Sequence, residues 1–318
     1  MKLKLHIGHG KTGSSYLQSW FACNSQLLFE NHGIFYPGDH KHAEKGHFST
    51  GNRKELDEII ESRRPRRWIQ KNLRQFSEKR LIPNTLFFSF EGLTRQFSMY
   101  SNKIARSAEL LGISDIDVLL IVRDPLDHAC SVYNQMVKRH GYFGSLDEWL
   151  EVYDFTDHLL QTIQELSENR DLWNLRIEHY DKVSTSLSDL AIDWLNTPPS
   201  SLYNQTPNSI VNRSLTYEEL FLMRIVNKKL SVDKSRLLGE RLVNQFPEST
   251  SFNPKPSANS SRRFVEKWNE KVETINSLIP IGAQLHLDTS ASYKQKEESD
   301  FINLSRQYID CIVDCLAD

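Results

Sequence analysis

Residues 5–18 constrain the fold more than any other stretch of this chain. Their sequence, LHIGHGKTGSSYLQ, begins with apolar residues, continues through a glycine-rich turn and ends in residues that suit the start of a helix. Backbone N–H groups at a helix N-terminus point outward unpaired, the helix dipole adds partial positive charge, and glycines let the main chain approach an anion closely. The segment therefore predicts a phosphate-binding loop between the first strand and the first helix.

Six residues of this turn are expected to contact the anion: Gly10, Lys11, Thr12, Gly13, Ser14 and Ser15. Two general phosphate motifs overlap here. Gly8, Gly10 and Gly13 match the dinucleotide pattern G-x-G-x-x-G, and Gly8, Gly13 and Ser15 match the frame of a nucleoside-triphosphate P-loop. A kinase or ATPase would carry its lysine at position 14, whereas this chain has serine there and lysine at position 11. Lys11 inside the turn suits an anionic group that leaves from the outer end of the bound phosphate.

A second anion site is predicted after the apolar stretch 118–122. The five apolar residues indicate a buried parallel strand, Asp124 can cap the following helix, and Pro125 suits its first position. Arg123 then lies at the carboxyl end of the strand, where open α/β sheets bind their ligands. Ser131 falls on the second turn of the helix. An arginine fork and a hydroxyl are suitable donors for phosphate oxygens, and the alternative is a local Arg–Asp pair at a helix cap.

The two motifs together resemble those of bacterial sulfotransferases that use 3′-phosphoadenosine 5′-phosphosulfate (PAPS). That family carries an Ile-Gly-x-x-Lys-Thr-Gly run followed by two serines or threonines, and residues 7–15 reproduce it. In its 3′-phosphate motif a strand ends in arginine and a serine follows eight positions later, as Arg123 and Ser131 do. The resemblance is sharp only at these motifs and continues weakly at 212–215 and 262–264. It implies PAPS as the donor, released as adenosine 3′,5′-bisphosphate.

Sulfuryl transfer to an alcohol needs a base for the hydroxyl proton and a cation for the charge on the leaving phosphate. Lys11 suits the second role. We expect Glu91 to be the base, because it ends the apolar strand 85–90 at the same sheet edge as Arg123, and partial burial there would raise its pKa toward neutrality. Similar bacterial enzymes carry Ser-x-Glu or Ser-Glu at this strand end. The alternative is that Glu91 caps the next helix or pairs with Arg95.

His47 is the rival base. His40, His42 and His47 lie in the loop after the second predicted strand, and histidine can act as a base near neutral pH. Their spacing also invites a metal interpretation. No acidic or cysteine partner follows in a matching spacing, so no metal is expected and a solvated substrate loop is favoured.

The basic run RRPRRW at 63–68 offers a surface for an anionic acceptor such as an acidic saccharide. Its ordinary interpretation is a solvated helix start, with Pro65 near the first turn. The segment 53–82 lies between strands at their carboxyl edge and would cover the active site as an insertion.

Strands are predicted at about 3–8, 33–36, 85–90, 117–122 and 173–178, alternating with helical stretches. Alternation of this kind is typical of βαβ units. From about 205 onward the pattern is helical, including 215–230, 233–246 and 262–278. The sequence therefore predicts a P-loop type three-layer α/β fold with a central, mainly parallel sheet of about five strands. One domain is expected over 1–318, with an α/β core at 1–200 and a helical part at 201–318.

Composition agrees with a cytoplasmic enzyme. The 318 residues can bury a large core, and a formal net charge of −2 argues against a nucleic-acid partner. No run of about 18 apolar residues occurs, and the N-terminus passes directly into the first strand, so neither a membrane span nor a signal peptide is expected. Cysteines at 23, 130, 311 and 315 fit neither a disulfide framework nor a zinc spacing.

The sequence thus predicts a PAPS-dependent sulfotransferase that acts on a carbohydrate or another small hydroxyl-bearing molecule. Two alternatives stay open. A nucleotide-dependent kinase would use ATP and Mg²⁺, and a nucleotide-binding module without activity would keep the fold and lack the base.

Overall fold

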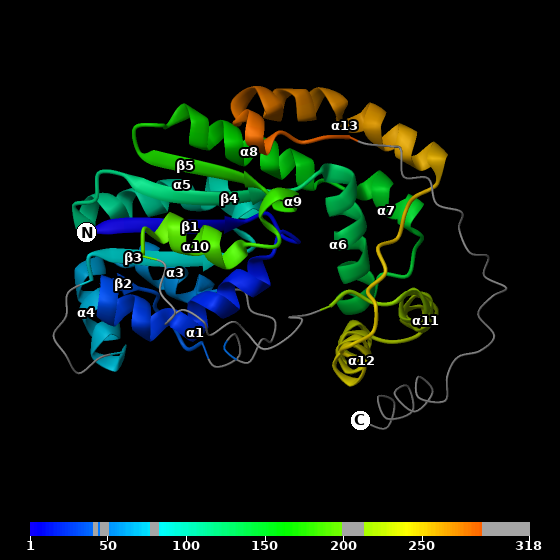
Figure 1. Ribbon diagram of the computed structural model, residues 1–318, viewed down its shortest axis with the longest axis horizontal. Coiled ribbons are helices and arrows are strands. Elements are labelled where there is room, and N and C mark those ends of the chain that lie inside the picture. The colour runs from blue at the N-terminus through cyan, green and yellow to red at the C-terminus, as the bar shows by residue number, and fades with distance from the viewer. Residues whose placement is uncertain (41–43, 45–50, 77–82, 199–212, 288–318) are drawn as a thin grey trace. The chain divides into compact units, whose positions relative to one another are not determined.

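The computed structural model describes residues 1–40, 44, 51–76, 83–198 and 213–287. Five strands form one sheet in the order β2-β3-β1-β4-β5 (Figure 1). Every neighbouring pair is parallel. The strands are β1 (Lys2–Gly8), β2 (Ile34–Phe35), β3 (Thr85–Phe90), β4 (Ile116–Val122) and β5 (Trp173–His179). The observed sheet confirms the predicted α/β class and the predicted strands, with β2 shorter than expected.

Register brings the carboxyl ends of the strands to one edge of the sheet. Ile7 of β1 pairs with Phe90 of β3, and Gly8 pairs with Ile121 of β4. The residues that follow these strands therefore meet at the same edge. Glu91, Arg123 and the loop after Gly8 are all placed there by backbone pairing alone.

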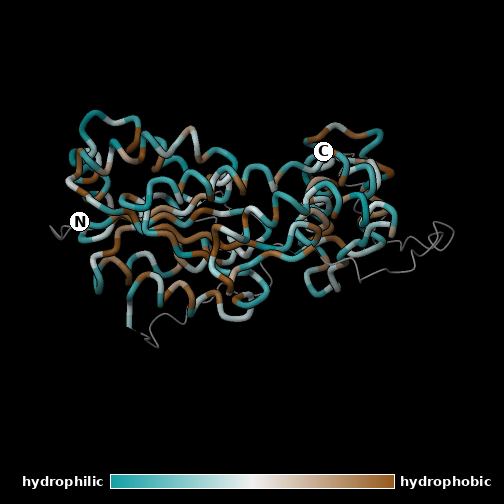
Figure 2. The backbone as a smooth tube through the Cα atoms, turned by 90° about the horizontal axis from the view of Figure 1, so that it is seen from above, coloured by the Kyte–Doolittle hydropathy of each residue, from teal (hydrophilic) through white to brown (hydrophobic). Residues whose placement is uncertain are grey.

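Helices cover both faces of this sheet, because each of the long central strands is buried on both sides and must be covered twice. On one face, α1 (Ser14–His32) and α10 (Leu187–Leu195) form a hydrophobic core with Phe87, Leu119 and Ile121. On the other, α5 (Leu93–Leu111) packs Tyr100 on Phe90 of the sheet, and α8 (Phe155–Glu168) packs against α5. Hydrophobic strands lie side by side between helices in Figure 2. The three layers are those that the sequence predicts.

The remaining helices beside the sheet are short. They are α3 (Arg53–Ile60), α4 (Pro65–Phe76) and α9 (Tyr180–Val183), with a 3₁₀ turn, η2 (Ile281–Ala283). The predicted insertion at 53–82 thus contains α3 and α4 within its described part.

The described residues form two compact units, between which the chain passes at 123–124, 154–155, 270–271 and 285–286. The first unit holds all five strands. The second is helical: α6 (Pro125–Arg139), α7 (Leu146–Val152), α11 (Tyr217–Asn227), α12 (Val232–Gln245) and the first part of α13 (Ala258–Leu278). The predicted helical C-terminal part is confirmed over 213–287, whereas the single domain over 1–318 stays a prediction.

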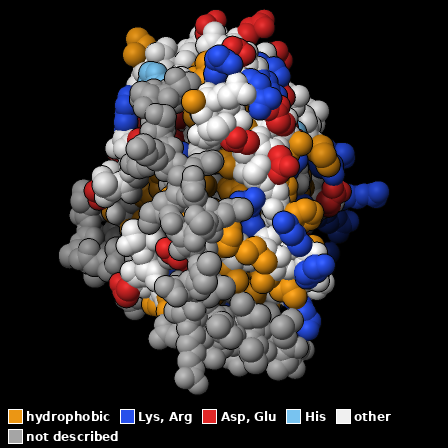
Figure 3. All heavy atoms as spheres, turned by 90° about the vertical axis from the view of Figure 1, so that its right-hand side faces the viewer, with side chains coloured by type: hydrophobic (Ala, Val, Ile, Leu, Met, Phe, Trp, Pro, Cys, Tyr) orange, Lys and Arg blue, Asp and Glu red, His pale blue; other side chains and the backbone are white. Residues whose placement is uncertain are grey.

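Hydrophobic side chains lie among lysines and arginines on the face of the molecule drawn in Figure 3. Exposed apolar side chains of the second unit include Phe143, Ile225 and Val232. Such scattered exposure is ordinary for a folded protein. None of the helices in the described part of the chain is long and apolar enough to span a bilayer.

Candidate functional site

The loop between β1 and α1 has an unusual backbone. Gly10, Lys11 and Gly13 have φ angles of 78°, 50° and 80°, a region that L-residues other than glycine seldom adopt. Gly13 is the N-cap of α1 and supplies no side-chain cap, and the first turn contains no acidic residue. The first bond of the helix runs from Leu17 N to Gly13 O, at 3.0 Å. The N–H groups ahead of Leu17 therefore form no bond within the helix and can bind an anion.

Two buried hydroxyls lie in the same turn. Thr12 Oγ1 and Ser14 Oγ are shielded from solvent, and neither has a hydrogen-bond partner among the described residues. Leaving such a group buried and unpaired costs about 1–3 kcal/mol. A phosphate or sulfate held against the helix N-terminus would accept from both. Ser15, half-buried in the first turn of α1, adds a third hydroxyl.

Two glycines of the loop are fixed by close packing. A Cβ on Gly8 would come within 2.5 Å of Glu91 Cα and 2.9 Å of Ser14 Oγ. A Cβ on Gly13 would come within 2.5 Å of Leu187 Cδ1. The loop is therefore clamped between the end of β3 and the start of α10, which holds its N–H groups in place for a ligand.

Arg123, which follows β4, reaches this loop. Its Nη1 donates to the carbonyl oxygen of Lys11 at 3.3 Å, and its guanidinium lies 5.2 Å from the ring centre of Tyr180. Its Nε is buried and has no hydrogen-bond partner within the described part of the chain. The structure thus places the predicted phosphate-binding arginine beside the predicted phosphate loop. Its Nε–H group can still donate a hydrogen bond to a ligand.

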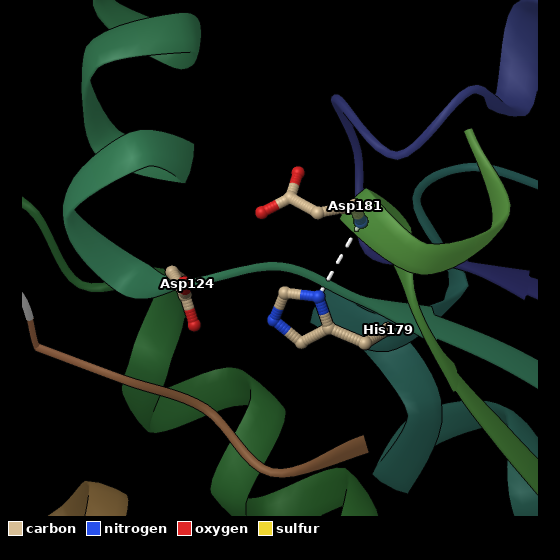
Figure 4. A group of neighbouring side chains, drawn as sticks. All are labelled: Asp124, His179 and Asp181. Carbon is tan, nitrogen blue, oxygen red and sulfur yellow. Dashed lines mark hydrogen bonds between the residues drawn. The ribbon is translucent and has the colours of Figure 1, made fainter. Parts of the chain in front are cut away.

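Tyr180 directly follows the last residue of β5. His179, the last residue of that strand, is buried, and its Nδ1 accepts from Asp181 N at 3.4 Å (Figure 4). This bond caps the short helix α9, which begins at Tyr180. The cap therefore orients the ring that lies against Arg123.

Four other candidate residues have different outcomes. Ser131 lies half-buried in α6 of the second unit, so its pairing with Arg123 stays a prediction. His47 and His42 fall outside the described residues. His40 is buried, stacks on the ring of Tyr36, and its Nε2 bonds the Tyr36 carbonyl oxygen at 3.1 Å. Burial lowers the pKa of His40, and its contacts are those of a core residue.

A cavity of about 280 Å³ adjoins the loop at the ends of β1 and β3. Glu91, the predicted base, lines it. The N-cap of α5 is Gly92, so Glu91 is not the capping residue of that helix. The other polar or charged side chains of the wall are His9, Arg53, Thr94, Arg95 and His158, and two aromatic rings, Phe90 and Phe155, complete it. Glu91 therefore lines a space that also adjoins the predicted phosphate-binding loop.

His9 is a site residue that the sequence interpretation missed. Its side chain is buried, and burial lowers its pKa from 6.5 to about 4, against a hydrogen bond to the Phe155 backbone that raises it and with the charge of His158 lowering it further. His9 is thus a neutral imidazole near pH 7. Its position inside the glycine-rich turn was a signal, because residues of such turns lie at the ligand.

Arg53 and His158 were also missed as residues of the cavity wall, and Arg95 was considered only as a partner of Glu91. They come from α3, α5 and α8, which are distant in sequence. Phe155 and His158 share a helix face because they are three residues apart, but no pattern in the sequence shows that this face meets the end of β3. Arg53 begins the segment 53–82 that was predicted to cover the active site, but no pattern singles out this residue within the segment.

No protein-family model matches this chain, and no curated protein matches it. Among solved structures, a sulfotransferase domain from the curacin biosynthetic pathway is similar over 84% of this chain and 97% of that domain, at 14% identity and a TM-score of 0.37. Retinol dehydratase, solved in complex with androsterone and the inactive cofactor PAP, is similar over 90% of this chain and 83% of its own, at 9% identity and a TM-score of 0.35. Likenesses of this strength say nothing about the activity of this chain.

Proposed function

We propose that this chain is a PAPS-dependent sulfotransferase that transfers a sulfuryl group to a hydroxyl of a carbohydrate or another small molecule. One observation carries the proposal. The uncapped N-terminus of α1 lies beside two buried hydroxyls, Thr12 Oγ1 and Ser14 Oγ, that have no partner in the described residues. Donors of this kind fit an anion, and the lysine inside the turn favours a phosphosulfate over the triphosphate of a kinase.

The residues that would hold PAPS divide into two groups. The 5′-phosphosulfate would be bound by the loop residues Gly10, Lys11, Thr12, Gly13, Ser14 and Ser15. The 3′-phosphate would be bound by Arg123, whose buried Nε suits an anionic acceptor, together with Ser131. When bound, PAPS supplies the sulfuryl group, and adenosine 3′,5′-bisphosphate is released.

Two side chains would carry the chemistry. The Glu91 carboxylate takes the proton of the acceptor hydroxyl as that oxygen bonds to sulfur, and the sulfur–oxygen bond to the phosphate breaks. The Lys11 ammonium stabilises the negative charge that the leaving phosphate gains. Glu91 lines a cavity next to the loop, which supports its role because a base must reach both the acceptor and the donor site.

Calorimetry with adenosine 3′,5′-bisphosphate and AMP tests the proposal. Each charge-assisted hydrogen bond to the 3′-phosphate contributes about 1.5–3 kcal/mol, so we expect the bisphosphate to bind at least about tenfold more tightly. Arg123→Ala should abolish this preference. Arg176→Ala is a matched control, because that guanidinium pairs with Glu178 and Asp193 on β5 and α10.

Equal affinities of the wild-type protein for the two nucleotides would contradict the second anion site. Turnover of ATP with Mg²⁺, without turnover of PAPS, would favour the kinase alternative. Tight binding of the bisphosphate without transfer to any acceptor would favour a binding module.

A further inference from the structure

We propose that α4 presents a docking surface for a linear acidic polysaccharide, at the end of the first unit that lies away from the cavity. The inference rests on the proposed function, because it names the acceptor as a saccharide polymer that the protein holds at a second place. Six exposed basic residues on α4 and just before it form this basic surface: Arg63, Arg64, Arg66, Arg67, Lys71 and Arg74.

The six positive charges of the basic surface have no acidic neighbours in sequence. Residues 62–76 contain neither aspartate nor glutamate. The last two acidic residues before this segment have other contacts: Glu58 accepts from Trp68 Nε1 at 2.9 Å, and Glu61 pairs with Lys103. Within the described part of the chain, none of the six basic residues forms an ion pair. The surface is therefore a local positive field on a chain whose formal net charge is −2.

Helical spacing aligns half of this charge in one row. Arg67, Lys71 and Arg74 stand at positions i, i+4 and i+7 and share a face of α4, over about 10 Å of the helix axis. Pro65 and Ile69, on the opposite side, are buried in the protein itself. The apolar side of α4 is thus already covered, so a bilayer would be met by charge alone, whereas membrane-surface helices also insert apolar side chains.

The start of α4 is far from the cavity. Arg66 Nη2 donates to the carbonyl oxygen of Leu111, the last residue of α5, at 3.4 Å. Thr94 and Arg95, at the start of the same helix, line the cavity. A helix of 19 residues is about 28 Å long, and Figure 1 shows α4 at the end of the sheet where the chain begins. The basic surface therefore cannot bind the group that occupies the cavity.

Only a long partner reaches both places. A single sugar residue fills the cavity, whereas a polysaccharide whose one residue lies there can extend to α4. Guanidinium groups form paired hydrogen bonds with the oxygens of sulfates and carboxylates, which are the charged groups of acidic polysaccharides. Each transfer would add a further sulfate to such a chain. The formal net charge of −2 argues against a nucleic acid as the partner.

Dextran sulfate and uncharged dextran of the same length test the surface, because they share a backbone and differ in charge. In calorimetry of the full chain without nucleotide, we expect dextran sulfate to bind about tenfold or more tightly than dextran, and its affinity should fall as salt screens the charges. Equal affinities, or no binding of dextran sulfate, overturn the proposal. Tighter binding of phosphatidylcholine–phosphatidylserine vesicles, or of a DNA duplex, than of dextran sulfate overturns it as well.

A triple variant removes the aligned row: Arg67→Gln, Lys71→Gln and Arg74→Gln. It should bind dextran sulfate about tenfold more weakly than the wild type. A double variant, Arg63→Gln with Arg64→Gln, leaves the helix itself unchanged and should also weaken binding, so the test does not depend on how α4 tolerates substitution. Dextran sulfate affinity that is unchanged in both variants overturns the proposal.

The matched control removes three exposed cations of the second unit and changes the net charge by the same amount: Lys228→Gln, Lys229→Gln and Arg262→Gln. An equal loss of dextran sulfate binding in the control and in the α4 triple variant overturns the proposal. Adenosine 3′,5′-bisphosphate should bind both variants as it binds the wild type. Failure of the wild type to bind the bisphosphate would instead contradict the proposed function, because the polymers are compared without nucleotide.

Discussion

Glu91 is the residue on which the proposed chemistry most depends. It follows the last residue of β3, and its Cα lies against Gly8, where a Cβ on the glycine would come within 2.5 Å. The backbone of Glu91 is thus fixed by strand pairing and by contact with the phosphate loop. Its side chain lines the cavity, so the carboxyl group extends into that space from a fixed backbone.

Glu91→Gln keeps the shape of the side chain and removes its basicity. We expect folding and affinity for adenosine 3′,5′-bisphosphate to survive, while transfer falls by about 10²–10⁴. Glu178→Gln on β5 is the control, because that carboxylate pairs with Arg176 and is not part of the cavity wall. Both kcat and the nucleotide Kd would be measured. Near-normal turnover in Glu91→Gln, with loss of turnover in His47→Ala, would move the base to His47.

The turn after β1 could be predicted from the sequence because its residues are contiguous. Glycines reveal the turn, and chain order places Lys11, Thr12 and Ser14 at it. The cavity could not be predicted. Arg53 and His158 meet there only because helices from distant parts of the chain pack at one sheet edge, and no local pattern encodes that packing.

At the scale of elements, the turn that leads into α1 depends on Gly13. Its φ of 80° disfavours any other residue, and a Cβ would meet Leu187 Cδ1 at 2.5 Å. Gly112, the C-cap of α5, has a similar φ of 72°, but a Cβ there would meet no atom closer than 3.8 Å. The two positions therefore share a backbone conformation that strains any residue with a Cβ, and they differ in crowding.

Gly13→Ala should lower affinity for adenosine 3′,5′-bisphosphate at least about tenfold, because the alanine methyl must displace Leu187 or the loop, and a shift of the N–H groups weakens several hydrogen bonds at once. Gly112→Ala should cost about 1–2 kcal/mol of stability from backbone strain and leave nucleotide affinity unchanged. Chemical denaturation and calorimetry on both variants would measure this. Equal effects of Gly13→Ala and Gly112→Ala on nucleotide affinity would contradict the role of close packing between the loop and α10.

Apolar runs predicted β3 and β4 to within a residue, since central strands need hydrophobic side chains on both faces. β2 is limited to Ile34–Phe35, where it pairs with β3. As an edge strand it pairs with one neighbour, so the sequence says little about where it begins and ends.

Arg213 lies in the segment 212–215, where the resemblance to sulfotransferases is weak, and it forms a buried ion pair with Glu219 at 2.7 Å. Its visible role is to hold the start of α11.

At the scale of the whole molecule, pH should act mainly through buried histidines. A formal net charge of −2 produces little self-repulsion. Burial lowers the pKa of His6 from 6.5 to about 4, and burial likewise lowers that of His9 to about 4. Between those values the unfolded chain binds protons that the folded chain does not, so the free energy of unfolding falls as pH drops.

The resulting prediction is that each of these two histidines contributes a loss of stability that begins below about pH 6.5, levels off below about pH 4 and amounts to about 3 kcal/mol. His6→Gln isolates one of the two, because His6 is buried and its Nδ1 bonds Ser89 Oγ at 2.8 Å, a contact that an amide can replace. The difference in unfolding free energy between the wild type and this variant should therefore move by about 3 kcal/mol in favour of the variant from pH 7.5 to pH 4. Urea denaturation of both proteins across this pH range measures the difference. The contributions of titrating groups that both proteins share cancel in this difference. His32→Gln at the end of α1 is the control. A difference between wild type and His6→Gln that does not vary with pH would contradict the burial of a neutral imidazole within β1.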